Sequence, residues 1–123
     1  MSNEAAIAAA RALFGAIEKG DVEGVRRIYA PHAKIWHNTD GVEQNVEENL
    51  AVLAWVIANI MDVRYTDARL QPTPSGFVQQ HVLRGIFKGS EIAIPACIVA
   101  TVENGLITRI DEYLDSAQIA QLR

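Results

Sequence analysis

The sequence predicts an α+β protein in which helices lie on one face of a curved antiparallel sheet. In the first half of the chain, apolar residues recur at helical spacing, with one short β-rich interruption. The second half holds four strand-like runs separated by turns rich in Gly, Pro and Asn. Helices and strands segregated in this way favour an α+β arrangement, here in the order ααβαββββ with a short C-terminal helix.

Two helices are expected at the beginning of the chain. The first follows a cap at Ser2 or Asn3 and ends at Gly20. Asp21 caps a shorter second helix that ends at Pro31. The apolar stripe of the first helix consists of Ile7, Ala10, Leu13, Phe14 and Ile17. This spacing places the stripe on one side of the helix, ready to cover a sheet.

The remaining elements are mostly strands. Residues 33–38, AKIWHN, predict a brief strand, and a third helix is expected from about Asn45 to Met61. Four strands follow, VRYTDARLQ, FVQQHVLRGIF, EIAIPACIVATV and LITRIDEYLD, and the short turns between them favour an antiparallel meander. A final helix is expected at Ser116 to Leu122, with Asp115 as its cap.

Length and composition narrow the function classes. The 123 residues suit a single domain spanning 1–123. A net charge of −4 with scattered Lys and Arg argues against nucleic acid as a partner, and no apolar run approaches the ~18 residues of a membrane span. The single Cys97 excludes an internal disulfide and fits a cytoplasmic location. His32, His37 and His81 lack any paired metal-binding spacing, so neither a metal nor another cofactor is expected.

Two strands carry polar residues on faces that are otherwise apolar. In FVQQHVL, alternation places Phe77, Gln79, His81 and Leu83 on one face. In the last strand, Glu112 shares a face with Leu106, Ile110 and Leu114. Burial disfavours the charged form of a carboxyl, which suits a group that transfers protons. The alternative is that Glu112 only accepts a hydrogen bond at the rim of a pocket.

The order of elements, the phrase YAPHAKIWHN after two helices, and the ending NGLITRIDEYLDSAQ resemble the nuclear transport factor 2-like superfamily, and within it the SnoaL-like polyketide cyclase group. The resemblance implies a cone-shaped fold, in which a strongly curved, mixed but mainly antiparallel sheet wraps the helices and leaves an apolar pocket open at one end. It also implies a homodimer formed through the sheets. The superfamily includes isomerases, cyclases, dehydratases, epoxide hydrolases and binding modules, so function must come from the site.

The branches of the superfamily differ in the strand that matches residues 77–83. The epoxide hydrolase branch has an arginine and an aspartate two residues apart where this chain has Gln79 and His81, which counts against epoxide hydrolysis. The polyketide cyclase branch resembles the chain in its glutamine and histidine, although its catalytic aspartate is matched only by Glu91, at a turn. The steroid isomerase branch requires a carboxylate on the first short strand, which AKIWHN lacks.

The first short strand gives two interpretations. Periodicity alone places Ile35 inside, because that choice keeps Lys34 out of the core. The resemblance to the epoxide hydrolase branch instead implies that Trp36 and Asn38 face the pocket, and we adopt this as the expectation. Trp36 then offers an apolar wall, and Asn38 an amide that orients a water or a carbonyl oxygen. The alternative is a core tryptophan and a turn-capping asparagine.

These residues together predict cofactor-independent acid/base chemistry beside a carbonyl, with isomerisation, cyclisation or dehydration as the outcome. His81 and Glu112 form the expected catalytic pair. The expected substrate-binding residues are Gln79, Trp36, Asn38, Phe77 and Leu83, and the expected partner is a small apolar or carbonyl-containing molecule. One alternative is a non-catalytic binding module for such a molecule or for a protein. A third interpretation makes the outer sheet face, with Val78, Val82 and Ile86, a dimer interface.

Overall fold

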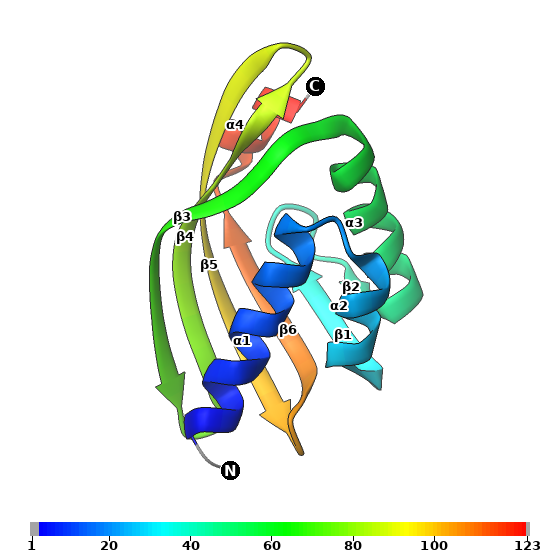
Figure 1. Ribbon diagram of the computed structural model, residues 1–123, viewed down its shortest axis with the longest axis vertical. Coiled ribbons are helices and arrows are strands. Elements are labelled where there is room, and N and C mark those ends of the chain that lie inside the picture. The colour runs from blue at the N-terminus through cyan, green and yellow to red at the C-terminus, as the bar shows by residue number, and fades with distance from the viewer. Residues whose placement is uncertain (1–2, 123) are drawn as a thin grey trace.

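The computed structural model describes residues 3–122. The protein folds into a six-stranded mixed sheet with helices on its concave side (Figure 1). The elements are α1 (Asn3–Glu18), α2 (Val22–Ile28), β1 (Tyr29–His37), β2 (Glu43–Gln44), α3 (Val46–Asn59), β3 (Ile60–Thr73), β4 (Gly76–Phe87), β5 (Ser90–Glu103), β6 (Leu106–Leu114), α4 (Ser116–Ile119) and the 3-10 helix η1 (Ala120–Leu122). The strand order is β2-β1-β6-β5-β4-β3. The predicted α+β class and the mixed, mainly antiparallel sheet are confirmed, because only the β1–β6 pairing is parallel.

The helix boundaries follow from local hydrogen bonds. Asp21 caps α2 by accepting a 2.9 Å hydrogen bond from the backbone N–H of Gly24. Asn45 and Glu48 form a reciprocal capping box at the start of α3, with both bonds at 2.9 Å. Asp115 accepts a bond from the backbone of Ala117 and caps α4 as predicted. No helix within residues 3–122 is both long and apolar enough to cross a bilayer.

Two boundaries differ from the sequence prediction, and one short strand is additional. β1 begins at Tyr29, directly after α2, so Pro31 lies inside a strand rather than after a helix. The third helix ends at Asn59, and the chain continues directly into β3 at Ile60. The two-residue strand β2 pairs with the end of β1 and was not predicted, because two residues carry no readable alternation.

Register shifts produce part of the curvature of the sheet. β3 shifts register twice against β4, near Asp62 and Asp67, which both have positive φ. β6 shifts register against β5 around Thr108, so that Ile107 and Ile110 are both buried. This finding corrects the strict alternation expected for the last strand, which placed Leu106, rather than Ile107, on the same face as Ile110.

The main core lies between α1 and the concave face of the sheet. The largest fully buried side chains are Phe77, Leu13, Ile35, Ile94, Ile107 and Val25. A second, smaller cluster forms where β3 begins and the β4–β5 hairpin turns, and Ile119 and Leu122 from the C-terminal segment pack against it. The space between these clusters is incompletely filled, and this gap is the location of the candidate site.

Candidate functional site

A pocket of about 190 Å³ lies on the concave side of the sheet, bounded by α1, α3 and the C-terminal segment. Its lining is mostly apolar and includes Phe14 from α1, Leu53 from α3 and Ile98 from β5. Six polar side chains also face it, namely Tyr29, His37, Asn49, Tyr65, His81 and Glu112. An apolar cavity with a few convergent polar groups is the usual form of a small-molecule site.

His37 and Glu112 form a hydrogen-bonded ion pair inside this pocket. The two residues lie opposite each other in the parallel β1–β6 pairing, and His37 Nε2 is 2.9 Å from Glu112 Oε1. Their side chains retain only 16% and 21% of their exposure. The hydrogen bond to Glu112 raises the pKa of His37 above its ordinary value, against the opposing effect of burial. The pair therefore holds a carboxylate and a proton donor together at low exposure to water.

His81 and Gln79 form a second polar pair, one strand pleat apart on β4. Both side chains are buried, and the Gln79 amide nitrogen is 3.0 Å from His81 Nδ1. The His81 ring packs against Phe14 and Tyr65, with ring centroids 5.1 and 4.5 Å away. Burial lowers the pKa of His81, so the neutral ring is favoured. Its Nε2 atom is buried and has no hydrogen-bond partner within residues 3–122.

Two tyrosines complete the polar groups of the pocket. The Tyr29 hydroxyl donates a 2.8 Å hydrogen bond to Asn49 Oδ1, and Asn49 Nδ2 donates in turn to Gln44 Oε1 at 3.2 Å. Burial raises the pKa of Tyr29 and of Tyr65, with a further contribution from the Glu112 charge. Both hydroxyls therefore stay protonated and remain hydrogen-bond donors at neutral pH.

The sheet register fixes where the two polar pairs lie. His37, Glu112, Ile98 and Gln79 are successive partners across four strands. Glu112 and Gln79 are thus two strand spacings apart, roughly 10 Å between backbones. Ala96 is the β5 partner of His81 and also lines the pocket. The apolar floor between the two polar pairs is consequently made by Ile98 and the small Ala96.

The structure places the sequence-predicted site residues in different environments. His81, Glu112 and Leu83 line the pocket. Gln79 does not line the pocket, but its side chain bonds to His81, which does line it. Phe77 is fully buried in the main core behind the wall. Its large ring fills the sheet–helix interface, which alternation alone does not distinguish from a pocket wall.

The expected inward placement of Trp36 and Asn38 was wrong. Trp36 packs against the exposed Tyr113, with ring centroids 5.4 Å apart. Asn38 bonds to the backbone N–H and carbonyl of Leu114 at 2.8 and 3.0 Å, so its amide joins the end of β1 to β6. The alternation that buries Ile35 also turns His37 inward. That simple alternation was the signal that would have found His37.

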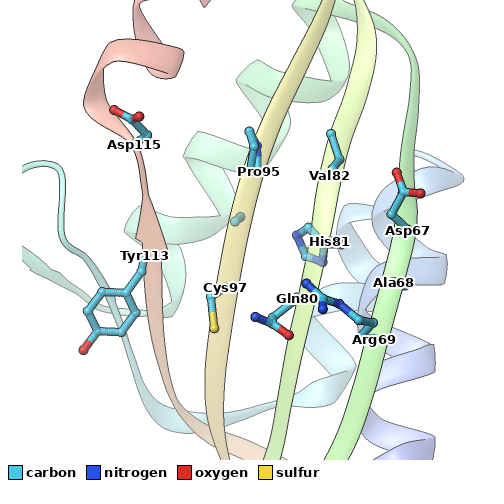
Figure 2. Close-up of a pocket in the computed structure, with 11 residues that line it drawn as sticks. Asp67, Ala68, Arg69, Gln80, His81, Val82, Pro95, Cys97, Tyr113 and Asp115 are labelled. Carbon is cyan, nitrogen blue, oxygen red and sulfur yellow. The ribbon is translucent and has the colours of Figure 1, made fainter.

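The convex face carries a separate, open hollow of about 720 Å³ (Figure 2). Gln80, Cys97 and Tyr113 line it, from three neighbouring strands. Cys97 is half-buried here rather than enclosed in the core. Val78, Val82 and Ile86 are half-buried on outward positions of β4. Association of two copies through this face stays a prediction.

Potential metal ligands do not cluster in the described part of the chain. Within residues 3–122, no three His, Cys, Asp or Glu side chains lie close enough together to hold a metal ion. Two hydrogen-bonded pairs are present instead, His37 with Glu112 in the pocket and His81 with the buried Gln79. Such pairs can transfer a proton and bind an oxygen atom of a ligand.

The two pocket histidines are expected to titrate on opposite sides of the ordinary value of 6.5. His37, with a raised pKa, stabilises the fold fully below pH 6.5, and this contribution is lost as pH rises through its folded-state pKa. For His81 the sign is opposite, because its lowered pKa removes stability as pH falls below 6.5. An NMR titration of the imidazole resonances measures both values. Glu112→Gln should lower the pKa of His37, and an unchanged value would contradict the pairing.

The curved sheet wrapped around helices, with a polar-lined apolar pocket, defines a nuclear transport factor 2-like protein. Residues 10–110 match the family model of the SnoaL-like domain, and the chain belongs to this family. A comparison with curated proteins gives no match.

Several solved structures share the fold. A candidate polyketide cyclase from Xanthomonas campestris pv. campestris has a TM-score of 0.86 at 18% identity, covering 99% of this chain and 100% of that one. PrhC from Penicillium brasilianum has a TM-score of 0.84 at 14% identity, covering 98% and 87%. An LEH-like epoxide hydrolase from M. tuberculosis has a TM-score of 0.77 at 17% identity, covering 96% and 88%. At such identities the likeness establishes the fold alone.

Proposed function

We propose that this protein is a cofactor-independent enzyme that moves a proton beside a carbonyl group of a small molecule. The observation that carries the proposal is the His37–Glu112 pair, joined at 2.9 Å inside an otherwise apolar pocket. The Glu112 carboxylate lies at low exposure and is held by the His37 hydrogen bond, which positions it for proton transfer. Isomerisation, cyclisation and dehydration all begin with such a proton abstraction.

The proposed roles follow from the hydrogen bonds. His37 engages Glu112 Oε1, so Oε2 is the oxygen that takes a proton from the carbon next to the substrate carbonyl. The electron pair of the broken C–H bond forms the enolate double bond, and negative charge develops on the carbonyl oxygen. The His81 Nε2–H, which has no partner within residues 3–122, donates a hydrogen bond to that oxygen. Return of the proton from Glu112 to a different carbon gives an isomer.

The polar groups of the pocket support this reaction class more than epoxide hydrolysis. The solved structures of the same fold include candidate polyketide cyclases and an LEH-like epoxide hydrolase. Gln79 and His81 bond to each other here, so the strand offers no arginine–aspartate pair for activating a water. Proton abstraction beside a carbonyl needs only a base and an oxygen-binding donor, and the pocket contains both.

Exchange of carbon-bound hydrogen in D₂O tests the proposal without knowledge of the natural substrate. The protein is incubated with simple ketones such as cyclohexanone and cyclohex-3-enone, and NMR follows loss of the protons next to the carbonyl. We expect exchange faster than in buffer containing the same concentration of free imidazole and acetate. A pocket that binds these ketones without accelerating exchange would favour the alternative, a non-catalytic binding module, for which the unpartnered His81 Nε2 is equally suitable.

A further inference from the structure

We propose that the pocket selects an uncharged molecule of about one ring that carries a hydrogen-bond-accepting oxygen, and that Gln79 imposes this choice by fixing His81 as an Nε2–H donor. This inference rests on the proposed function in that it names the substrate class of the same site. It is narrower, because proton abstraction by Glu112 is equally compatible with large or anionic carbonyl compounds. Polarity, size and charge of the pocket each support the narrower class.

The preference for an acceptor oxygen follows from the contact between Gln79 and His81. The Gln79 amide nitrogen, a donor only, faces His81 Nδ1 at 3.0 Å. Nδ1 must then be the acceptor, so the proton of the neutral ring is on Nε2. This N–H is buried without a hydrogen-bond partner within residues 3–122, although His81 lines the pocket. An unmet buried donor is unfavourable, and an oxygen of a bound molecule would satisfy it.

The size of the ligand is limited by the volume and the floor of the pocket. A cavity of about 150 Å³ accommodates benzene in another protein, so the 190 Å³ here corresponds to one ring with a few added atoms. The space exists because Ala96, between His81 and Leu114 across the sheet, has only a methyl side chain. Ile98 fills the neighbouring position between Gln79 and Glu112. A ring over Ala96 would lie between the His81 donor and the Glu112 carboxylate.

Charge selection follows from the absence of a free counterion. Among the described side chains that line the pocket, none is Lys or Arg. The ionisable residues His37 and Glu112 already bond to each other at 2.9 Å. A ligand carboxylate or ammonium would therefore lose its hydration without gaining a partner. An uncharged oxygen acceptor avoids that cost.

The first experiment compares four probes by NMR titration, with the Ala96 methyl group and the His81 ring nitrogens as reporters. Cyclohexanone has one ring and an acceptor; methylcyclohexane lacks the acceptor, cyclohexanecarboxylate adds a charge, and anthrone has three rings. We expect cyclohexanone to bind about tenfold more tightly than methylcyclohexane, since one hydrogen bond to a buried donor is worth up to about that factor. Cyclohexanone should also bind more tightly than the carboxylate, which loses its hydration, and than anthrone, which exceeds the volume of the pocket. Equal or tighter binding of the carboxylate or of anthrone would overturn the proposal.

The same spectra identify the His81 tautomer in the free protein. Long-range ¹H–¹⁵N correlations should show the proton on Nε2, and Gln79→Leu should remove this preference and weaken cyclohexanone binding relative to methylcyclohexane. A proton on Nδ1 in the unsubstituted protein would mean that the Gln79 amide presents its oxygen, and the acceptor-selecting role would be refuted. These readouts report the ring itself, so a merely structural role of Gln79 would not produce them.

A pocket-filling variant provides the matched control. Ala96→Leu places extra atoms on the floor and should abolish cyclohexanone binding, whereas Val99→Leu, on the exposed outer position of the same strand, should bind as the unsubstituted protein does. Binding that persists in Ala96→Leu would place the ligand elsewhere. The two proposals fail separately. Binding as expected without exchange would refute the proposed enzyme activity but not the ligand class. Catalysed exchange of larger or charged ketones would refute the ligand class but not the enzyme activity.

Discussion

Replacing Glu112 by Gln is expected to slow carbonyl-adjacent proton exchange by about 10²- to 10⁴-fold, the usual contribution of a positioned general base. The substitution keeps the size and one acceptor oxygen of the side chain but removes its capacity to take a proton. His37 then loses the hydrogen bond to a carboxylate, which is what raises its pKa. The exchange assay in D₂O measures the rate, and chemical denaturation shows whether the variant remains folded.

Glu103→Gln is the matched control, because Glu103 is an exposed carboxyl at the end of β5 and does not line the pocket. It should exchange ketone protons at the rate of the unsubstituted protein. A folded Glu112→Gln variant with full activity would show that Glu112 is only a hydrogen-bond acceptor at the pocket rim.

His81→Phe should keep the ring packing against Phe14 and Tyr65 but lose the oxygen-binding donor, giving a smaller loss of rate than Glu112→Gln.

Replacing Phe77 by Ala is expected to lower the free energy of unfolding by about 3–5 kcal/mol. Phe77 is fully buried, and its ring centroid is 6.3 Å from that of Phe14 in an edge-to-face arrangement. Its loss would leave a cavity beneath α1, because the surrounding main core is held by the sheet and relaxes only partly. Urea denaturation measures the change.

Trp55→Ala is an informative comparison, since it removes a larger ring whose residue is 44% exposed on α3. We expect a clearly smaller loss of stability for Trp55→Ala than for Phe77→Ala, because much of the Trp55 ring already contacts water. If Phe77→Ala instead kept its stability and lost only ketone binding, Phe77 would be a pocket residue as the sequence suggested, and its place in the core would be incorrect.

Most of the fold could be predicted because its signals are local. Asp21 and Asp115 cap helices at the predicted positions, and four strands occur in the C-terminal half as predicted. The exceptions depend on tertiary context. The bulge around Thr108 reverses the alternation of β6 ahead of Ile110, in a strand that pairs with both β5 and β1. A single sequence does not show such a requirement.

The site was partly predictable for a related reason. His81 and Glu112 stand out as polar residues on apolar faces, and both line the pocket. His37 was missed although Ile35 marked the inward face of its strand, because the family resemblance was preferred to the alternation. The Gln79–His81 bond was also hidden, since a two-residue spacing gives proximity but not the direction of the side chains.

The parallel pairing of β1 with β6 has a consequence for when the site exists. His37 lies on β1 and Glu112 on β6, which are the first and last strands in the sequence but neighbours in the sheet. Their hydrogen bond joins these two strands. A chain that has folded only its helices and the β3–β5 meander therefore lacks the His37–Glu112 pair in its pocket. Long-range pairing of this kind is a slow event in folding, because it joins the strands that lie farthest apart in the sequence among the strand pairings. Activity of the proposed kind would thus begin only when the final strand is in place, and it would serve as a chemical assay of complete folding.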